Sequence, residues 1–210
     1  MNAPEPSLPT REQIALLPRF QNLTTEQIVV INSLPQCHQL QQELTTATLL
    51  GFDTESKPTF TKGQISTGPH LIQLATIQKA YLFQISAPIL AFLKPILENK
   101  AQIKVGFSLK NDAHLFRKKG IELNSIVELS KCFSSFGFNH TMGLKNAMVL
   151  LFQLNFPKNK SISTSNWARK ILTSQQMDYA AADAYAPVLV FEELLRLGLI
   201  PQNLPKTTAK

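Results

Sequence analysis

The chain has 210 residues, which suffice for one domain with a sizeable core but not for two ordinary domains. No apolar run approaches the roughly 20 residues that cross a bilayer, and the acidic, proline-containing start is unlike a secretory signal. The 21 Lys and Arg outnumber the 14 Asp and Glu, and a net charge of +7 favours a polyanionic partner.

The two ends of the chain differ in character from the middle. Residues 1–22 hold four of the thirteen prolines and show no clear period, so we expect a mobile N-terminal arm. We expect one folded domain over residues 23–200 and a frayed tail over 201–210. The two cysteines, Cys37 and Cys132, indicate no disulfide framework, so the cytoplasm is the expected compartment.

Between these ends, short apolar runs alternate with amphipathic stretches. In chain order this pattern predicts a strand at Ile28–Ile31, a helix at Gln36–Leu44, and strands at Leu49–Thr54, His70–Thr76 and Lys79–Gln84. It then predicts a helix at Ile89–Glu98, a strand at Gln102–Phe107, a helix from an N-cap at Ser108 to Lys119, a short strand at Ser125–Glu128, and helices at Met142–Leu154 and from Ser174 onward. The hairpin at Ile77–Gln78 argues against a purely parallel sheet, so the fold class is α/β with a mixed sheet flanked by helices.

The last helix has clear start and stop signals. Thr173, followed three residues later by Gln176, forms a capping box, and Gly198 ends the helix. Pro187 lies inside it and removes one backbone hydrogen bond, which we expect the helix to tolerate.

Aspartate is scarce, and its positions are informative. The chain has only four, and Asp53, Asp112 and Asp183 lie in apolar or helix-forming segments, where an unpaired charge costs free energy. Asp53 and Glu55 end the strand LLGFDTE, and residues i and i+2 of a strand project from one face, so the two carboxylates converge. Oxygen ligands of this kind suit Mg²⁺ or Mn²⁺.

The remaining acids come from two helices. Asp112 lies in the first turn of the helix after the strand IKVGF, where an acid also suits the helix dipole. Tyr179 and Asp183 stand one turn apart on the last helix, separated by three alanines that would let its backbone approach a sheet closely. These acids can converge on two divalent cations, Mg²⁺ or Mn²⁺, which clamp the attacking and leaving oxygens of a phosphoryl displacement.

The order and spacing of these motifs resemble the DEDDy 3′–5′ exonucleases, the family of RNase D, the proofreading domain of DNA polymerase I and the Werner-syndrome exonuclease domain. GFDTE resembles the first motif, VGFSLKNDAHLF the second and LTSQQMDYAAADAY the third. SNWARKILT and KPTFTKG are most similar to Werner-like members, and the resemblance covers roughly Gln27 to Leu197.

The resemblance implies an RNase H-like fold and a nuclease that releases nucleoside 5′-monophosphates from the 3′ end of DNA, RNA or both. It implies that Asp53, Glu55, Asp112 and Asp183 hold the metals and that Tyr179 positions the water. DNA, or both nucleic acids, is favoured. The alternatives are an RNase D-like RNA-trimming or short-oligonucleotide enzyme, an RNase H-like endonuclease, and a non-catalytic nucleic-acid-binding adaptor, which would be expected to have lost some of the acids.

Several further residues are candidates for substrate contact. Lys57 and Lys110, with Lys62 and the run Arg117–Lys119, could line a phosphate path, but a charge run of this kind is more often a solvated helix end. Phe60 could stack on a terminal base, although core packing is the favoured role. We expect Trp167 to anchor the loop before the last helix. The histidines lack the spacing of a zinc site.

Overall fold

The computed structural model describes residues 7–59 and 67–200. Its centre is a six-stranded sheet in the order β1-β4-β3-β2-β5-β6. The strands are β1 (Ile28–Ile31), β2 (Leu49–Glu55), β3 (Leu71–Ala75), β4 (Ala80–Gln84), β5 (Ile103–Gly106) and β6 (Ile126–Glu128). The pairs β2–β3 and β3–β4 are antiparallel, whereas β1–β4, β2–β5 and β5–β6 are parallel. The sheet is therefore mixed, as the hairpin predicts.

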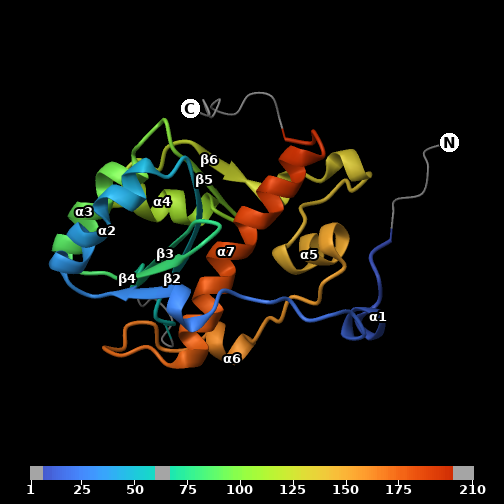
Figure 1. Ribbon diagram of the computed structural model, residues 1–210, viewed down its shortest axis with the longest axis horizontal. Helices are drawn as coiled ribbons and strands as arrows, with labels where there is room; N and C mark the ends of the chain where they lie inside the picture. The colour runs from blue at the N-terminus through green and yellow to red at the C-terminus, as the bar shows by residue number, and fades with distance from the viewer. Residues whose placement is uncertain (1–6, 60–66, 201–210) are drawn as a thin grey trace.

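Helices cover both faces of the sheet (Figure 1). They are α1 (Arg11–Ala15), α2 (Leu34–Thr46), α3 (Ala87–Leu97), α4 (Lys110–Lys118), α5 (Leu144–Phe152), α6 (Lys160–Ser163) and α7 (Ser174–Arg196), with short 3-10 turns at Thr25–Gln27, Leu129–Lys131 and Ser134–Phe136. In Figure 1, α2, α3 and α4 lie on one side, while α7 crosses the other side beside α5. Phe52 of β2 and Phe116 of α4 pack on the first side, and Ala184 and Val188 of α7 pack on the second.

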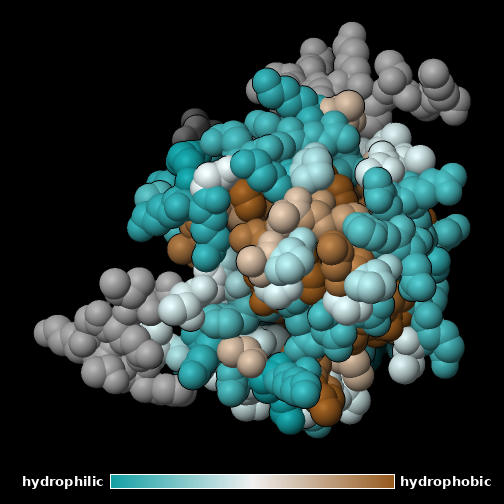
Figure 2. Space-filling view, turned by 90° about the vertical axis from the view of Figure 1, so that its left-hand side faces the viewer, coloured by the Kyte–Doolittle hydropathy of each residue, from teal (hydrophilic) through white to brown (hydrophobic). Residues whose placement is uncertain are grey.

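The outer side of α3 is unusually apolar. Ala87, Pro88, Ala91 and Pro95 are exposed there beside Lys94, and the half-buried Leu90 and Phe92 flank them. Figure 2 shows apolar side chains gathered on this face of the molecule. This face lies across the sheet from α7, so it does not shape the acidic site described below.

Helix α7 packs closely on β2 because one residue of the strand has no side chain. A Cβ on Gly51 would lie 1.9 Å from the carbonyl oxygen of Ala184 and 2.8 Å from Cγ2 of Val188. Ala180, Ala181 and Ala184 are all fully buried on the helix side of this contact. Glycine on the strand and alanine on the helix therefore bring the backbone of α7 against the strand that ends in Asp53 and Glu55.

The ends of α7 follow the predicted signals. Thr173 is the N-cap and forms the capping box with Gln176, and Gly198 follows the helix with φ of 68°. The helix continues through Pro187, which is buried. The predicted tolerance of Pro187 is thus consistent with the observed helix.

Two expectations differ from the structure. Ser108 does not cap α4, because its φ is 63° and its backbone N–H donates to Oε1 of Glu128 at 2.9 Å. The Glu128 carboxylate also accepts from the N–H of Leu109 at 2.7 Å, so an acid from β6 satisfies the start of the helix. In the expected N-terminal arm, the described residues 7–22 include helix α1 and the buried Phe20, so tertiary packing orders a segment that has no periodic signal.

Candidate active site

The strand β2 delivers two carboxylates to one face of the sheet. Asp53 and Glu55 stand opposite Gln73 and Leu71 of β3, two residues apart, and so project to the side where α7 lies. One Asp53 oxygen accepts a hydrogen bond from the backbone N–H of Thr54 at 2.8 Å. The predicted convergence of these two acids is observed.

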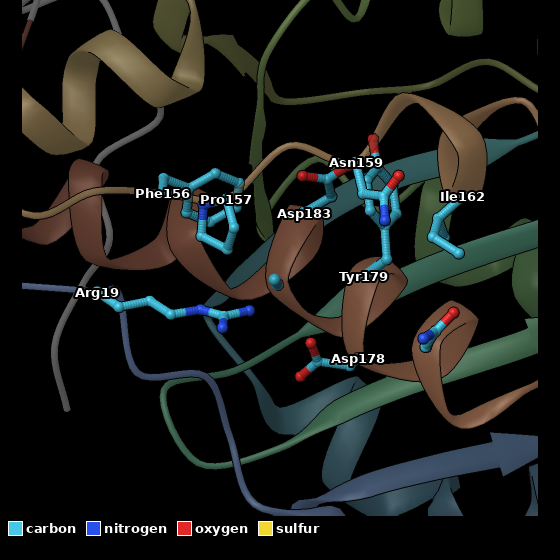
Figure 3. A pocket seen from close by; sticks show the side chains of 10 residues that line it. Arg19, Phe156, Pro157, Asn159, Ile162, Asp178, Tyr179 and Asp183 are labelled. Carbon is cyan, nitrogen blue, oxygen red and sulfur yellow. The ribbon is translucent and has the colours of Figure 1, made fainter. Parts of the chain in front are cut away.

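Helix α7 brings the third carboxylate to the same place. Asp183 is only 7% exposed, and its Oδ1 has no hydrogen-bond partner among the described residues. Burial raises the pKa of Asp183, and the hydroxyl of Tyr179, which lies one turn earlier, offsets part of that rise. Figure 3 shows Tyr179 and Asp183 projecting from one side of α7 and Asp178 from another.

Asp112 approaches from the opposite face of the sheet. Thr54 points away from its neighbours Asp53 and Glu55, and its hydroxyl donates a hydrogen bond to Oδ1 of Asp112 in the first turn of α4. The charge of Asp112 still acts on the other acids, because it raises the pKa of both Asp53 and Glu55. Asp112 therefore belongs to the same electrostatic cluster but stands behind Thr54.

Burial and mutual repulsion make this cluster unfavourable when it is fully ionised. Burial raises the pKa of Asp53 well above its usual range, and the charges of Asp183, Glu55 and Asp112 raise it further. Burial and the charge of Asp183 raise the pKa of Glu55 to about 8. A divalent cation would remove both penalties, because it replaces lost hydration with direct oxygen ligation.

The donor set fits such a cation. Carboxylate oxygens are hard ligands, and the unpartnered buried Oδ1 of Asp183 offers a free lone pair. Within residues 7–59 and 67–200, no three His, Cys, Asp or Glu side chains already form a finished ligand group. Side-chain rotation would therefore have to draw the carboxylates together around an ion.

A cavity of about 260 Å³ opens over these acids. Its walls come from β2, α7, the segment after β5, the start of α5 and the loop after α5: Asp53, Thr54, Glu55, Phe107, Ser108, Gly143, Leu144, Lys158, Tyr179 and Asp183. A second cavity of about 180 Å³ lies beside Tyr179 and Asp183 and extends toward Arg19 (Figure 3).

Lys158 is the site residue that sequence reasoning missed. It lines the same cavity as Glu55 and Asp183. Burial raises the pKa of both acids, and the charge of Lys158 offsets part of that rise. The only sequence signal was the basic loop PKNKS, which has no diagnostic spacing.

The other predicted contact residues lie elsewhere. Lys57 is exposed just after β2, and its backbone N–H donates to Nδ1 of His70 at 3.1 Å. Lys110 lines a different hollow, between α4 and β6, together with Arg117 and Ile126. Phe60 and Lys62 fall outside the described residues, so their predicted contacts remain predictions.

Trp167 has the anchoring position that we expected. It is 1% exposed, its indole N–H donates to the carbonyl of Ser163 at 3.1 Å, and its ring centroid lies 6.1 Å from that of Tyr179. The loop before α7 is therefore fastened to the domain beside the tyrosine.

Comparison with known proteins supports the resemblance. The family model described as 3′–5′ exonuclease matches residues 28–198. The mouse protein named bifunctional 3′–5′ exonuclease/ATP-dependent helicase WRN is 33% identical over 173 residues, covering 76% of this chain and 12% of that protein. This chain spans between 12% and 49% of the length of three curated relatives that it matches.

Two solved structures show the same fold. The Aedes aegypti Nibbler EXO domain aligns with a TM-score of 0.70 at 22% identity, covering 83% of this chain and 92% of that one. Trypanosoma brucei RNase D in complex with RNA U12 aligns with a TM-score of 0.70 at 15% identity, covering 92% and 66%. In the part of the chain that the structure describes, no helix is both long and apolar enough to span a membrane.

Proposed function

The chain belongs to the 3′–5′ exonuclease family, and from that membership we propose that it hydrolyses the terminal phosphodiester bond at the 3′ end of a nucleic acid. The observation that supports this best is the cavity in which Asp53, Glu55 and Asp183 meet Tyr179. The reaction would release nucleoside 5′-monophosphates, and its cofactors would be two divalent cations, Mg²⁺ or Mn²⁺.

The carboxylates are proposed to hold the metals. Asp53, Glu55 and Asp183 would be direct ligands, and Asp112, whose carboxylate is engaged by the Thr54 hydroxyl, would contribute directly or through a water. When bound, the metals would supply Lewis-acid activation and charge neutralisation for an in-line displacement.

Tyr179 is proposed to orient the attacking water without losing its own proton. Burial and the charges of Asp183 and Glu55 raise its pKa well above the usual value for a phenol, so the hydroxyl stays protonated. A neutral hydroxyl can donate one hydrogen bond and accept another, which positions a water but does not deprotonate it. The new P–O bond forms as the bond to the 3′ oxygen breaks, the water gives its proton to solvent, and the leaving oxygen takes one up.

Lys158 is proposed to contact the substrate phosphate. It is a cation on the wall of an acidic cavity, where a phosphodiester would otherwise meet only negative charge. A lysine acts there as a compact point charge. It would offset part of the repulsion between the incoming phosphate and the acids.

For the nucleic acid we propose DNA, or DNA and RNA together. The Werner-like sequence similarity favours this choice, and the net charge of +7 suits either polyanion. The rival is RNA trimming or degradation of short oligonucleotides, because the solved RNase D structure with the same fold contains an RNA.

The test uses single-stranded DNA, recessed duplex DNA and RNA of one sequence, each labelled either at the 5′ end or at the 3′-terminal nucleotide, with Mg²⁺ or Mn²⁺. The proposal expects ladders that shorten from the 3′ end, mononucleotide product, and complete loss of cleavage in EDTA. Internal cutting of a circular substrate would instead indicate an endonuclease. Binding without cleavage of any substrate would indicate the non-catalytic adaptor.

A further inference from the structure

A short N-terminal segment lies against the candidate active site although it precedes the family match, which starts at residue 28. We call Pro18–Asn22 the N-terminal strap. It pairs with the chain after α5, where Arg19 and Asn155 form a parallel bridge. The N–H of Asn155 donates to the carbonyl of Pro18 at 2.8 Å, and the N–H of Phe20 donates to the carbonyl of Asn155 at 3.0 Å.

Side chains reinforce this pairing. The ring of Phe20, 6% exposed, lies with its centroid 5.1 Å from that of Phe156 and 6.2 Å from that of Tyr185 on α7. Asn22 donates to both the carbonyl and the carboxylate of Asp178, each at 2.8 Å. The strap is thus fastened both to the loop after α5 and to the turn of α7 that carries Tyr179.

The loop that the strap holds is the one that carries Lys158. Only Pro157 separates Phe156, which is 1% exposed, from Lys158. The Lys158 side chain is exposed, and its ammonium makes no hydrogen bond or short ion pair with the described residues. Nothing at the side-chain end fixes the ammonium, so its position over the cavity depends on the backbone of this loop (Figure 3 shows Phe156 and Pro157 beside α7).

We propose that the N-terminal strap is a positioning element of the active site, which holds Asn155 and Phe156 so that Lys158 meets the phosphate of the terminal nucleotide. This inference rests on the proposed exonuclease function. Phe20 touches no reacting atom and acts through Lys158. The packing of Phe20 and the two backbone hydrogen bonds hold the loop in place. The backbone of the loop in turn determines how far the Lys158 ammonium lies from the carboxylates of the cavity.

A double-mutant cycle on the full chain tests this coupling. Phe20→Ala and Lys158→Ala are each expected to lower kcat by about 100-fold, the order of loss that a displaced or missing electrostatic group causes. In the Lys158→Ala background, Phe20→Ala should lower kcat by less than about twofold, because the group that it positions is gone. Phe20→Leu, which keeps an apolar side chain in the same place, should recover most of the turnover.

Leu16→Ala is the matched control, since Leu16 belongs to the same N-terminal region but is 86% exposed. If Phe20→Ala does not fold, Asn22→Ala takes its place in the cycle, because it breaks the tie to Asp178 without opening the core. The inference would be overturned if the two losses of kcat multiplied in the double variant, or if the Lys158→Ala protein kept the wild-type kcat. Cleavage by an Asp53→Asn protein would overturn the proposed exonuclease function itself, which separates the two failures.

Discussion

Replacing Gly51 by alanine should damage both folding and catalysis, because the new methyl group has no room. Its Cβ would lie 1.9 Å from the carbonyl oxygen of Ala184, and that contact must open to at least about 3.0 Å, a displacement of about 1 Å. The obstacle is the backbone of α7, which cannot rotate away as a side chain could. Overpacking of this kind costs about 1–3 kcal/mol of the free energy of unfolding.

The same displacement moves Asp183 and Tyr179 away from Asp53, since all of α7 shifts outward from β2. A misplacement of about 1 Å in a catalytic group can cost on the order of 100-fold in rate. Urea unfolding and single-turnover cleavage of a 5′-labelled oligonucleotide measure the two effects. Gly143→Ser is the control for stability, because a Cβ there meets nothing within 4 Å and φ is −82°. Wild-type stability together with wild-type turnover in Gly51→Ala would refute the close packing described here.

Three further predictions concern single groups. Tyr179→Phe should lower turnover by about 100-fold while Mn²⁺ affinity measured by calorimetry stays unchanged; a loss of affinity as large as that of Asp183→Ala would show that the tyrosine role is misassigned. The folded-state pKa of Glu55 is raised to about 8. The metal-free protein should therefore lose stability as pH rises from about 5 to 8, and Mg²⁺ should remove this trend. Thermal melts in EDTA that show no such pH dependence would contradict the prediction. Lys104 is fully buried, and burial lowers its pKa to about 8. The unfolded chain therefore binds more protons than the folded protein between about pH 8 and 10.5, so stability should rise with pH in that window. Lys104→Met should abolish this rise in melting temperature.

Much of the fold was predictable because its signals are local. The hairpin β3–β4 follows from two apolar runs around a tight turn, and the start of α7 follows from Thr173 and Gln176. The three acids that meet at the cavity were also predictable, because strand periodicity aligns Asp53 with Glu55 and the alanines beside Asp183 lower the helix surface. Gly51 of β2 lies opposite these alanines, and its missing side chain lets the backbone of α7 approach the strand closely.

The features that were not predictable depend on residues far apart in the chain. The cap of α4 comes from Glu128, twenty residues after Ser108, so no local pattern at Ser108 reveals it. Phe20 packs against Phe156 and Tyr185, which gives residues 18–22 a fixed place although Pro18 and the lack of a period predict none. Lys158 looks like any lysine of a polar loop until the fold brings that loop over the acids.

The position of Asp112 was predictable only in part. The motif order predicts that it joins the other acids, and its charge raises the pKa of both Asp53 and Glu55. Its approach from the α4 side, behind the Thr54 hydroxyl, depends on how α4 docks against β2 and has no sequence signature.

The most direct test of the central claim compares wild type with Asp53→Asn, which keeps the shape of the side chain and removes its charge. Both proteins are incubated with Mn²⁺ and an oligonucleotide labelled at its 3′-terminal nucleotide, and mononucleotide release is followed while calorimetry measures Mn²⁺ binding. We expect stepwise release by the wild type, and no detectable release and greatly weakened metal binding in Asp53→Asn. Release of mononucleotides by Asp53→Asn at the wild-type rate would contradict the claim.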